Sequence, residues 1–348
     1  MVKSEPELVS VVIVNYNGRR SLGKVFERCL DSVLRTDYPR FEVLFVDNAS
    51  TDGSAELVET RYGEDKRLRV IRNERNLGYA EGNNRGIRQA KGAFIALLNS
   101  DTEVDIGWLS ELVETAKQAG VGAVQSKLLR LDNPSVLDSA GGWVDYYGYH
   151  LERGRGQEAS SYSRTSEIFY AKGAGVLLNR DVLQKTGLFD SDFFMYFEEV
   201  DLCWRIWLAG YRVLFAPASL VRHASGSTAS RLQERTRLYF SIRNHLLVLL
   251  KNYGFSNKVK SEVVSVLFEL RNMAVFAARR KPLVVLAIGQ ALLWNLSHLK
   301  DTWMKRRVVQ ERVRRVSDEE IQRHMVKPYP PFPLYLVFSR SRYQRRQN

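Results

Sequence analysis

Cysteine is scarce in this chain of 348 residues, which contains only Cys29 and Cys203. Neither has a partner at the spacing of a metal site, and two thiols cannot form a disulfide framework. At 45% hydrophobic residues, the chain is long enough to bury a sizeable core without such cross-links. The sequence therefore predicts a protein held together by its core, in reducing surroundings.

Two glycine-rich phosphate-binding patterns are also missing. No G-x-G-x-x-G follows the first apolar run, and no G-x-x-x-x-G-K-[ST] occurs anywhere. These absences exclude the common dinucleotide fingerprint and the Walker loop. The first ten residues, MVKSEPELVS, lack a charged segment followed by an apolar one, so we expect no export signal and a cytoplasmic location.

Positive charge is concentrated in the C-terminal third of the chain. From Arg231 onward there are 24 Lys+Arg and 8 Asp+Glu, which leaves 28 and 31 for residues 1–230. Charge alone does not choose among nucleic acid, an anionic membrane surface and a phosphorylated substrate as the partner.

Short β-branched runs alternate with helical patterns in the first hundred residues. We predict strands at 9–14, 41–46, 69–71 and 94–98, and helices at 22–34, 54–62 and 81–90. This alternation indicates an α/β fold with a doubly wound sheet. The polar clusters NYNG, DNASTDGS and NSD follow three of these strands, so we expect a ligand site at the carboxyl edge of the sheet.

The basic C-terminal region reads as a series of helices. Patterns at 234–251 and 262–279 are followed by an apolar run after Pro282, interrupted by Gln290, Asn295 and His298, and by an Arg-rich helix at 306–323. We predict basic amphipathic helices that lie on a membrane surface. A membrane-spanning helix after Pro282 and simple packing on the domain or a second subunit are the alternatives.

Three carboxylates crowd the stretch FMYFEEVDLCWR, at Glu198, Glu199 and Asp201. Taken alone, they could form a structural network at a helix start, where negative charge is favourable. Asp47 and Asp101, at predicted strand ends, could accept hydrogen bonds from a base and bind a hard cation, or could simply form turns.

Six motifs in order give these residues a common context. They are VVIVNYNG, VDNASTDGS, NLGYAEGNNRGI, LLNSDT, GLFDSDFFMYFEEVDLCWR and HASGST. With them the chain, from Val9 to about Asn244, resembles the inverting glycosyltransferases of family 2, which have a GT-A fold with a mixed, Rossmann-like sheet. Among these it is most similar to bacterial rhamnosyltransferases that build cell-surface polysaccharide.

The resemblance implies a domain plan. Residues 1–230 would form the GT-A catalytic domain, with a nucleotide-sugar half at about 1–103 and an acceptor half at about 104–230. Residues 231–348 would form the basic helical C-terminal region, associated with the membrane.

It also implies a donor site. The residues expected to bind the nucleotide-sugar are Val14, Asn15, Tyr16, Asn17, Asp47, Asn76, Gly78, Asn83, Asn99, Ser100, Asp101 and Arg243. Asp47 would recognise the base, and Gly78 and Gly82 would bring backbone close to the ribose and diphosphate. Arg243 or Arg237 could reach the diphosphate.

The metal and catalytic positions depart from the family pattern. The usual Asp-x-Asp reads Asn99-Ser100-Asp101 here, so Asp101 would be the main ligand of Mg²⁺ or Mn²⁺, with His223 as the second. The usual Glu-Asp-x-Asp reads Glu198-Glu199-Val200-Asp201, so Glu199 takes the place of the catalytic base, with Asp201 and Glu198 as alternatives.

Expected acceptor contacts are Trp143, Gly173, Ala174 and Asp190. Tyr146, Tyr147 and Tyr149 crowd the same segment as Trp143, where stacking on sugar and packing in the core are both open.

The implied activity is inverting transfer of a sugar, best guess L-rhamnose, from a dTDP- or UDP-sugar to a glycan or a polyprenyl-diphosphate-linked acceptor. We expect a cytoplasmic protein, peripheral on the inner face of the cell membrane, with no nucleic-acid partner and with homo-oligomers as an option. A catalytically weak scaffold, in which Asn99 and Glu199 mark lost activity, is the alternative; a nucleic-acid-binding protein is a distant one.

Overall fold

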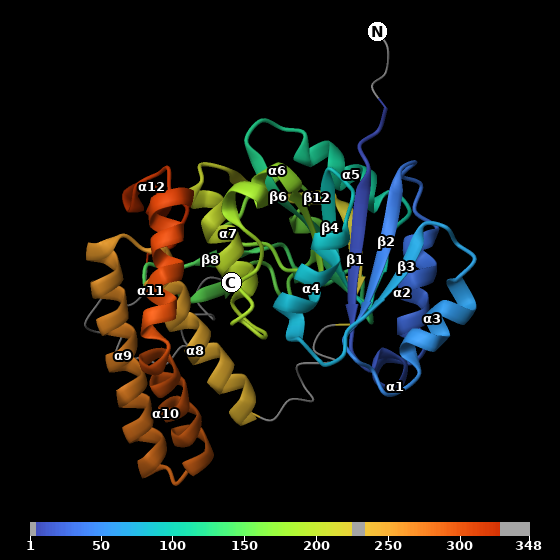
Figure 1. The fold of residues 1–348 in the computed structure, drawn as a ribbon. Helices are drawn as coiled ribbons and strands as arrows, with labels where there is room; N and C mark the ends of the chain where they lie inside the picture. The colour runs from blue at the N-terminus through green and yellow to red at the C-terminus, as the bar shows by residue number, and fades with distance from the viewer. Residues whose placement is uncertain (1–4, 225–233, 328–348) are drawn as a thin grey trace.

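A twisted mixed β-sheet forms the centre of the molecule, and a bundle of C-terminal helices stands at one end of it (Figure 1). The computed structural model describes residues 5–224 and 234–327. The main sheet has the order β10-β12-β6-β11-β4-β1-β2-β3, with β5 paired to β12 and β7 paired to β6, while β8 and β9 form a separate ribbon. The strands are β1 (Val9–Asn15), β2 (Phe41–Asp47), β3 (Leu68–Arg72), β4 (Phe94–Asn99), β5 (Thr102–Val104), β6 (Val121–Arg130), β7 (Leu137–Ser139), β8 (Gly142–Val144), β9 (His150–Glu152), β10 (Ser166–Glu167), β11 (Gly175–Asn179) and β12 (Arg212–His223).

The four N-terminal strands are parallel, as the sequence predicts. β1 pairs with both β2 and β4, in registers that place Asn15 opposite Asp47 and Val14 opposite Asn99. The carboxyl ends of these strands therefore meet at one edge of the sheet, which brings the predicted polar clusters together.

The second half of the sheet is mixed. β11 runs antiparallel to both β4 and β6, β12 runs parallel to β6, and β5 pairs antiparallel with β12. The β5–β12 register sets Thr102 opposite His223. This pairing carries His223 to the turn that follows β4.

Helices cover both faces of the sheet. Alternate residues of β1 point to opposite sides, so Val11 and Ile13 join the core under α2 and α5, whereas Val12 joins the core under α4 and α7. The helices of this part are α1 (Gly18–Leu22), α2 (Lys24–Leu34), α3 (Ser54–Tyr62), α4 (Gly78–Gln89), α5 (Trp108–Ala116), α6 (Arg180–Thr186) and α7 (Glu198–Leu208), with a 3-10 turn η1 (Ala159–Ser161).

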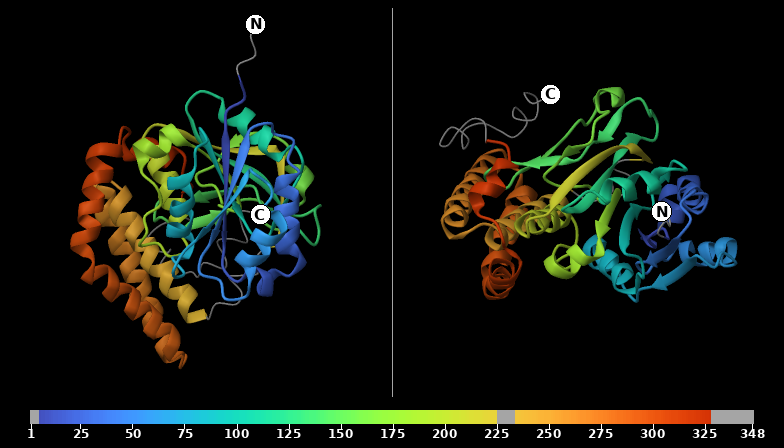
Figure 2. Two further views of the ribbon diagram at one scale, coloured as in Figure 1. Left: turned by 45° about the vertical axis from the view of Figure 1, so that its right-hand side comes forward. Right: turned by 90° about the horizontal axis from the view of Figure 1, so that it is seen from above.

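The C-terminal helices pack against the sheet domain through α7 (Figure 2). They are α8 (Glu234–Asn252), α9 (Phe255–Ala278), α10 (Pro282–Ser297), α11 (Leu299–Val308), a π-helical turn η3 (Val309–Val313) and α12 (Asp318–Arg323). Lys251 of α8 lies 3.0 Å from Asp201 of α7 and 2.7 Å from Asp190, which also pairs with Lys305 of α11. The helical region is therefore bonded to the element that carries the carboxylate cluster.

Two predicted helices are interrupted in the structure. The helix expected at 22–34 breaks at Gly23, whose φ of 56° lies in the left-handed region. The Arg-rich helix expected at 306–323 was wrong as one element: the chain extends at Arg314, Arg315 N–H donates to the carbonyl of Leu208, and Ser317 caps α12.

Within the described residues, no single helix has the length and apolar composition needed to cross a bilayer. The bent pair of α10 and Leu299–Val313, with an angle of 63° between its halves, meets those requirements only when taken together.

Candidate active site

A polar corner forms where β1 and β2 end. The Asn15 amide donates to one oxygen of Asp47 at 3.2 Å, and the Ser50 N–H donates to the other at 2.9 Å. Asp47 is only 3% exposed, so these bonds fix its carboxylate. Each oxygen can accept a further hydrogen bond, which suits the predicted contact with a base.

The segment expected to line the base and ribose lies at this corner. Asn17 adopts a left-handed conformation with φ 54°, and its side chain accepts the Thr51 N–H at 2.8 Å. Val14 is half-buried, and Tyr16 presents its ring with 48% exposure. The structure thus places residues 14–17 beside Asp47, on the expected edge.

The glycines of the Asn76–Asn83 segment approach protein atoms. A Cβ on Gly78, whose φ is 75°, would stand 2.4 Å from the carbonyl oxygen of Phe194, and one on Gly82 would stand 2.9 Å from Val14. These glycines let the start of α4 pack against β1 and the loop before α7. The Gly78 N–H donates to the side-chain oxygen of Asn76, and the amide of the buried Asn83 donates to the Tyr79 carbonyl oxygen. Both side chains therefore have a partner within the protein.

Asp101 lies in the turn between β4 and β5, after Asn99 and Ser100. Its carboxylate is 3.2 Å from Nε2 of His223, and Nδ1 of His223 is 2.9 Å from the carboxylate of Asp138 on β7. The three side chains form a row. Burial alone would lower the pKa of His223, but the hydrogen bonds to Asp101 and Asp138 outweigh it and raise that pKa to about 9.

Two side chains of this row could hold a divalent cation once the cation displaces the proton on Nε2 of His223. The Asp101 carboxylate oxygen and Nε2 face each other, and Asp138 fixes the ring orientation through Nδ1. Within residues 5–224 and 234–327 no cluster of three or more His, Cys, Asp or Glu side chains is arranged to hold a metal. Any cation at Asp101 and His223 would need further oxygens from its ligand.

Glu199 stands in the first turn of α7, after two residues with unusual backbone conformations. Tyr196 and Phe197 both have φ of 68°, a strained value for aromatic residues. The Gly173 N–H donates to Glu199 Oε1 at 2.6 Å. Burial raises the pKa of Glu199, and the Gly173 N–H and the charges of Lys172 and His223 reduce this rise without cancelling it.

The other two carboxylates of the cluster have different surroundings. Asp201 is fully buried between Arg205 and Lys251; burial opposes its ionisation, yet these cations keep its pKa below the usual value. Burial and the Glu199 charge raise the pKa of Glu198 well above its usual value. Asp201 is paired with two cations, whereas Glu199 accepts a backbone N–H at one oxygen only, so Glu199 is the favoured base of the three.

The Asp101–His223 pair is linked to Glu199 by an electrostatic effect. Burial raises the pKa of the Glu199 carboxyl group, and the charge of His223, which touches Asp101, lowers it in part.

Arg243 is engaged elsewhere. Its guanidinium packs over the rings of Phe240 and Trp294 and donates to the carbonyl of Asp192. The structure therefore places it in the packing of α8 against α10. Arg237 is exposed to solvent. Burial raises the pKa of Tyr196, and the charge of Arg237 lowers it in part, so Arg237 lies closer than Arg243 to the start of α7.

The expected acceptor residues are only partly brought together. Gly173 and Ala174 lie beside Glu199, and Trp143 is half-buried on β8, but Asp190 is held by Lys251 and Lys305. Tyr147 and Tyr149 are buried against Val264 and Phe268 of α9, so packing explains these two.

A polar cavity of about 690 Å³ borders His223 and Asp138. Its walls include Arg28, Arg130, Arg155 and Arg222, each paired with a carboxylate. Paired arginines and carboxylates therefore form the wall beside His223.

The sheet has a parallel half with a polar carboxyl edge. Mixed strands adjoin it and bring a histidine to the aspartate at a strand end. This is the architecture of a GT-A glycosyltransferase. The model of the family described as Glycosyl transferase family 2 matches residues 10–202, and the chain belongs to this family.

Two relatives are similar in sequence. The chain is 32% identical over 224 residues to the O-antigen biosynthesis protein RfbC of Myxococcus xanthus, a match that covers 62% of this chain and 17% of RfbC. It is 28% identical over 249 residues to the N-acetylglucosaminyl-diphospho-decaprenol L-rhamnosyltransferase of Mycobacterium tuberculosis, covering 65% of this chain and 78% of that enzyme. The chain thus spans well under two thirds of RfbC.

The fold is also similar to solved structures. GalNAc-T7, crystallised with UDP, GalNAc and Mn²⁺, superposes with a TM-score of 0.59 at 19% identity, covering 74% of this chain and 50% of that one. At this identity the likeness shows the fold alone.

Three residues with a place in the site escaped sequence reasoning. Asp138 orients His223, Lys251 neutralises Asp201, and Tyr79 lies against Gly173. Asp138 and Lys251 carry no motif signal, since each reaches its partner only through folding. Tyr79 lies inside a recognised motif, but nothing in the sequence places its hydroxyl against Gly173.

Proposed function

We propose that this glycosyltransferase moves a sugar, with L-rhamnose as the first candidate, from a dTDP- or UDP-sugar to a glycan or a polyprenyl-diphosphate-linked acceptor, with inversion at the anomeric carbon. The observation that carries the proposal is the Asp101–His223 pair after β4, whose histidine charge acts on the buried Glu199 carboxyl group. The L-rhamnosyltransferase name of the mycobacterial relative supports the choice of sugar, and the O-antigen name of RfbC supports a glycan acceptor.

Each group has a distinct task in this proposal. Glu199 accepts the proton of the attacking hydroxyl, and its raised pKa brings its basicity closer to neutral pH. Asp47 and residues 14–17 hold the nucleotide, and the half-exposed Tyr16 offers a ring face for the base. A single basic carboxylate is what one-step displacement needs, since the hydroxyl attacks from the side opposite the leaving group.

Asp101 and His223 would hold Mg²⁺ or Mn²⁺, and Asp138 would keep Nε2 of His223 turned toward the ion. The cation would offset the negative charge of the departing diphosphate. The Mn²⁺ named with GalNAc-T7 supports a divalent ion without choosing between the two metals.

A panel of dTDP-, UDP- and GDP-sugars tests this function. Purified protein is incubated with each donor and Mg²⁺ or Mn²⁺, and released nucleotide diphosphate and thermal stabilisation are measured. We expect one dTDP- or UDP-sugar to stand out, with Glu199→Gln binding it but releasing no product. Equal, negligible turnover of every donor would remove the proposal and favour a scaffold.

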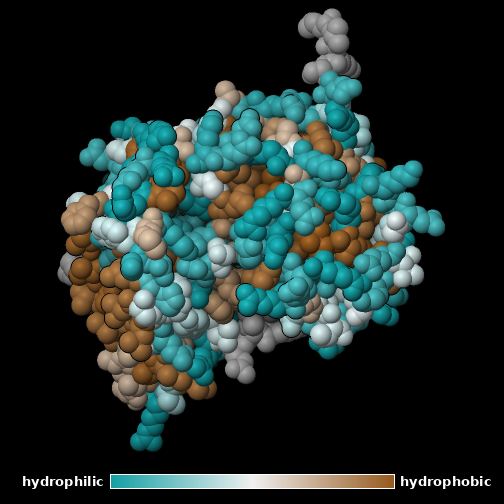
Figure 3. Space-filling view, in the orientation of Figure 1, coloured by the Kyte–Doolittle hydropathy of each residue, from teal (hydrophilic) through white to brown (hydrophobic). Residues whose placement is uncertain are grey.

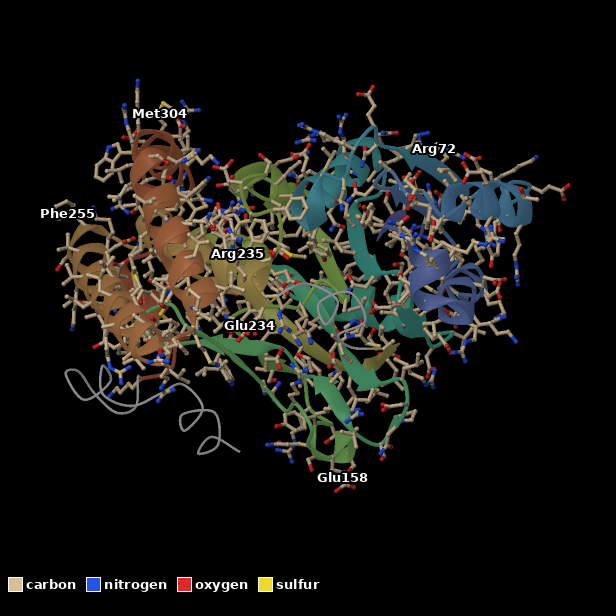
Figure 4. The ribbon with its side chains drawn as sticks, turned by 90° about the horizontal axis from the view of Figure 1, so that it is seen from below. Arg72, Glu158, Glu234, Arg235, Phe255 and Met304 are labelled. Carbon is tan, nitrogen blue, oxygen red and sulfur yellow. The ribbon has the colours of Figure 1, made fainter. Side chains whose placement is uncertain are left out.

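We also propose that the protein lies on the cytoplasmic face of the cell membrane through the outer surface of α9, α10 and α11, which would bring a lipid-linked acceptor to the site. Of 15 exposed large hydrophobic side chains in the described residues, 13 lie on these helices: Phe255, Val259, Val263, Leu267, Leu270, Leu283, Leu286, Leu293, Leu296, Leu299, Trp303, Met304 and Val308. Figure 3 shows the apolar surface over this end of the molecule, and Figure 4 shows Phe255 and Met304 on the side away from the sheet.

Cations accompany this apolar surface. Arg279, Arg280 and Lys281 are exposed at the turn between α9 and α10, and Lys260 and Lys300 are exposed on α9 and α11. Apolar side chains beside cations fit the headgroup region of an anionic bilayer.

Point variants test this better than truncation, because Lys251 and Lys305 tie the helices to Asp190. Leu293→Glu with Leu296→Glu should abolish flotation with anionic liposomes, whereas Ile106→Glu, at a 65% exposed apolar residue of the sheet domain, should not. Unchanged flotation of the double variant contradicts membrane docking. Dissociation of a dimer by the same variant would assign the face to a second copy instead.

A further inference from the structure

Tyr79 is attached to the segment that carries Glu199. It is the second residue of α4, and its N–H donates to the carbonyl of Phe194 at 2.8 Å, four residues before α7 begins. Its ring packs edge-on against Phe189, with centroids 6.1 Å apart. The start of α4 and the start of α7 therefore hold a fixed relation.

The Tyr79 hydroxyl and the Glu199 carboxylate both lie beside Gly173. A Cβ built on Gly173 would lie 1.6 Å from the Tyr79 hydroxyl oxygen and 3.0 Å from Glu199 Oε1. No side chain fits at this position, and glycine is what allows both groups to sit there. The hydroxyl and the carboxylate are thus close neighbours on one glycine.

The hydroxyl oxygen of Tyr79 is buried and has no hydrogen-bond partner among the described residues. The amide of Asn83, on the same helix, donates to the Tyr79 carbonyl oxygen instead. Burial and the charges of Glu199 and Glu198 raise the pKa of Tyr79 well above its usual value, although the Asn83 side chain, which lies near the hydroxyl, opposes this rise. The group therefore keeps its proton and can donate it to a hydrogen bond.

We propose that Tyr79 is a positioning residue for the base: the Gly173 N–H already donates to Glu199 Oε1, and the unpartnered Tyr79 hydroxyl supplies a second donor when it closes on the carboxylate, so that this two-donor cradle orients the Glu199 carboxylate and favours its charged form. The cradle leaves the second carboxylate oxygen for the attacking hydroxyl. This inference rests on the proposed function, and it explains how glutamate, longer than the usual aspartate by one methylene, is held at the base position.

Other charged and titratable groups also face Glu199. They are Glu198 on α7, Lys172 beside Gly173, Glu152 on β9, His223 on β12, and the buried Tyr170 and Cys203. Glu152 disfavours the charged carboxylate, whereas Lys172 and His223 favour it. None of these is altered by removing one phenolic oxygen, so Tyr79→Phe isolates the contribution of the hydroxyl.

The test is the pH profile of donor turnover in Tyr79→Phe. Losing a donor to the charged form raises the pKa of Glu199, so the acid limb of kcat/KM should move up by about one pH unit, while the KM for the donor stays the same. In a Glu199→Gln background, adding Tyr79→Phe should change the residual rate no further. Tyr211→Phe, whose hydroxyl bonds Lys185 away from the site, is the matched control.

Two results overturn the inference: an acid limb that stays in place, or a loss in Tyr79→Phe that is equally large in the Glu199→Gln background. If wild-type protein turns over no donor, the proposed function fails separately. The cradle is then tested by following the ¹³C signal of the Glu199 carboxyl group with pH in the protein without donor. This signal is assigned as the one that disappears in Glu199→Gln. Its midpoint should rise in Tyr79→Phe, and an unchanged midpoint contradicts the cradle.

Discussion

Lys251 should be worth several kcal/mol to the folded state, because it neutralises two buried carboxylates at once. Its amino group lies 2.7 Å from Asp190 and 3.0 Å from Asp201, under the ring of Phe193. Lys251→Met keeps the apolar stem and removes the charge. Stranding a buried partner costs about 3 to 5 kcal/mol. Since Asp190 keeps Lys305 and Asp201 keeps Arg205, we expect about 3 kcal/mol, the lower end of that range.

The loss should depend on pH in a definite direction. Burial opposes ionisation of Asp190 and Asp201, but their cations hold both pKa values below the usual range in the folded state. Their stabilising effect is therefore complete above the unfolded pKa of about 3.9 and is lost as the pH falls through the lower folded values. The difference between wild type and Lys251→Met should be full at pH 7 and shrink under strongly acidic conditions.

Urea unfolding, followed by tryptophan fluorescence and circular dichroism, measures this difference. Lys260→Met is the control, since Lys260 is exposed on α9 and should change the free energy of unfolding by no more than about 0.5 kcal/mol. A loss below about 1 kcal/mol for Lys251→Met at pH 7 would refute the reasoning, because a buried charge pair cannot be broken so cheaply.

Two further predictions concern the site itself. Asp138→Asn should weaken Mn²⁺ binding by about 10- to 100-fold, because the His223 ring loses the carboxylate that orients it. Calorimetry with UDP present measures this affinity. An unchanged affinity would show that Asp138 does not affect the ion. Because burial raises the pKa of Glu199, and its basic form is the active one, donor turnover should rise with pH through a midpoint above the ordinary glutamate value; a rate already at its plateau at pH 4 would exclude Glu199 as the base.

The architecture of the parallel half was predictable because its signals are local. β-branched runs predicted β1, β2, β3 and β4 to within two residues at each end, and α3 matched its predicted range. The strands of the mixed half could not be predicted one by one, since β6, β11 and β12 pair across long separations that no short pattern records.

The site residues also differ in whether local sequence signals could predict them. Asp47, Asp101 and Glu199 stand in motifs, and the structure gathers their surroundings at one edge. Asp201 could not be judged from the sequence. Its carboxylate was an alternative candidate for the base, but the fold places it between Arg205 and Lys251, which pair with it. Arg243 illustrates the same point, because aromatic rings from α8 and α10 take up the face of its guanidinium.

The central claim is that Asp101 with His223 and Glu199 act on the two sides of one reacting carbon. An anomalous difference map from crystals grown with UDP and Mn²⁺ tests it most directly. The account predicts a manganese peak in contact with Asp101 and His223, with the UDP diphosphate on the ion and the Glu199 carboxylate facing the open end of that diphosphate. A manganese ion and UDP bound in a cleft that Glu199 does not face would contradict it.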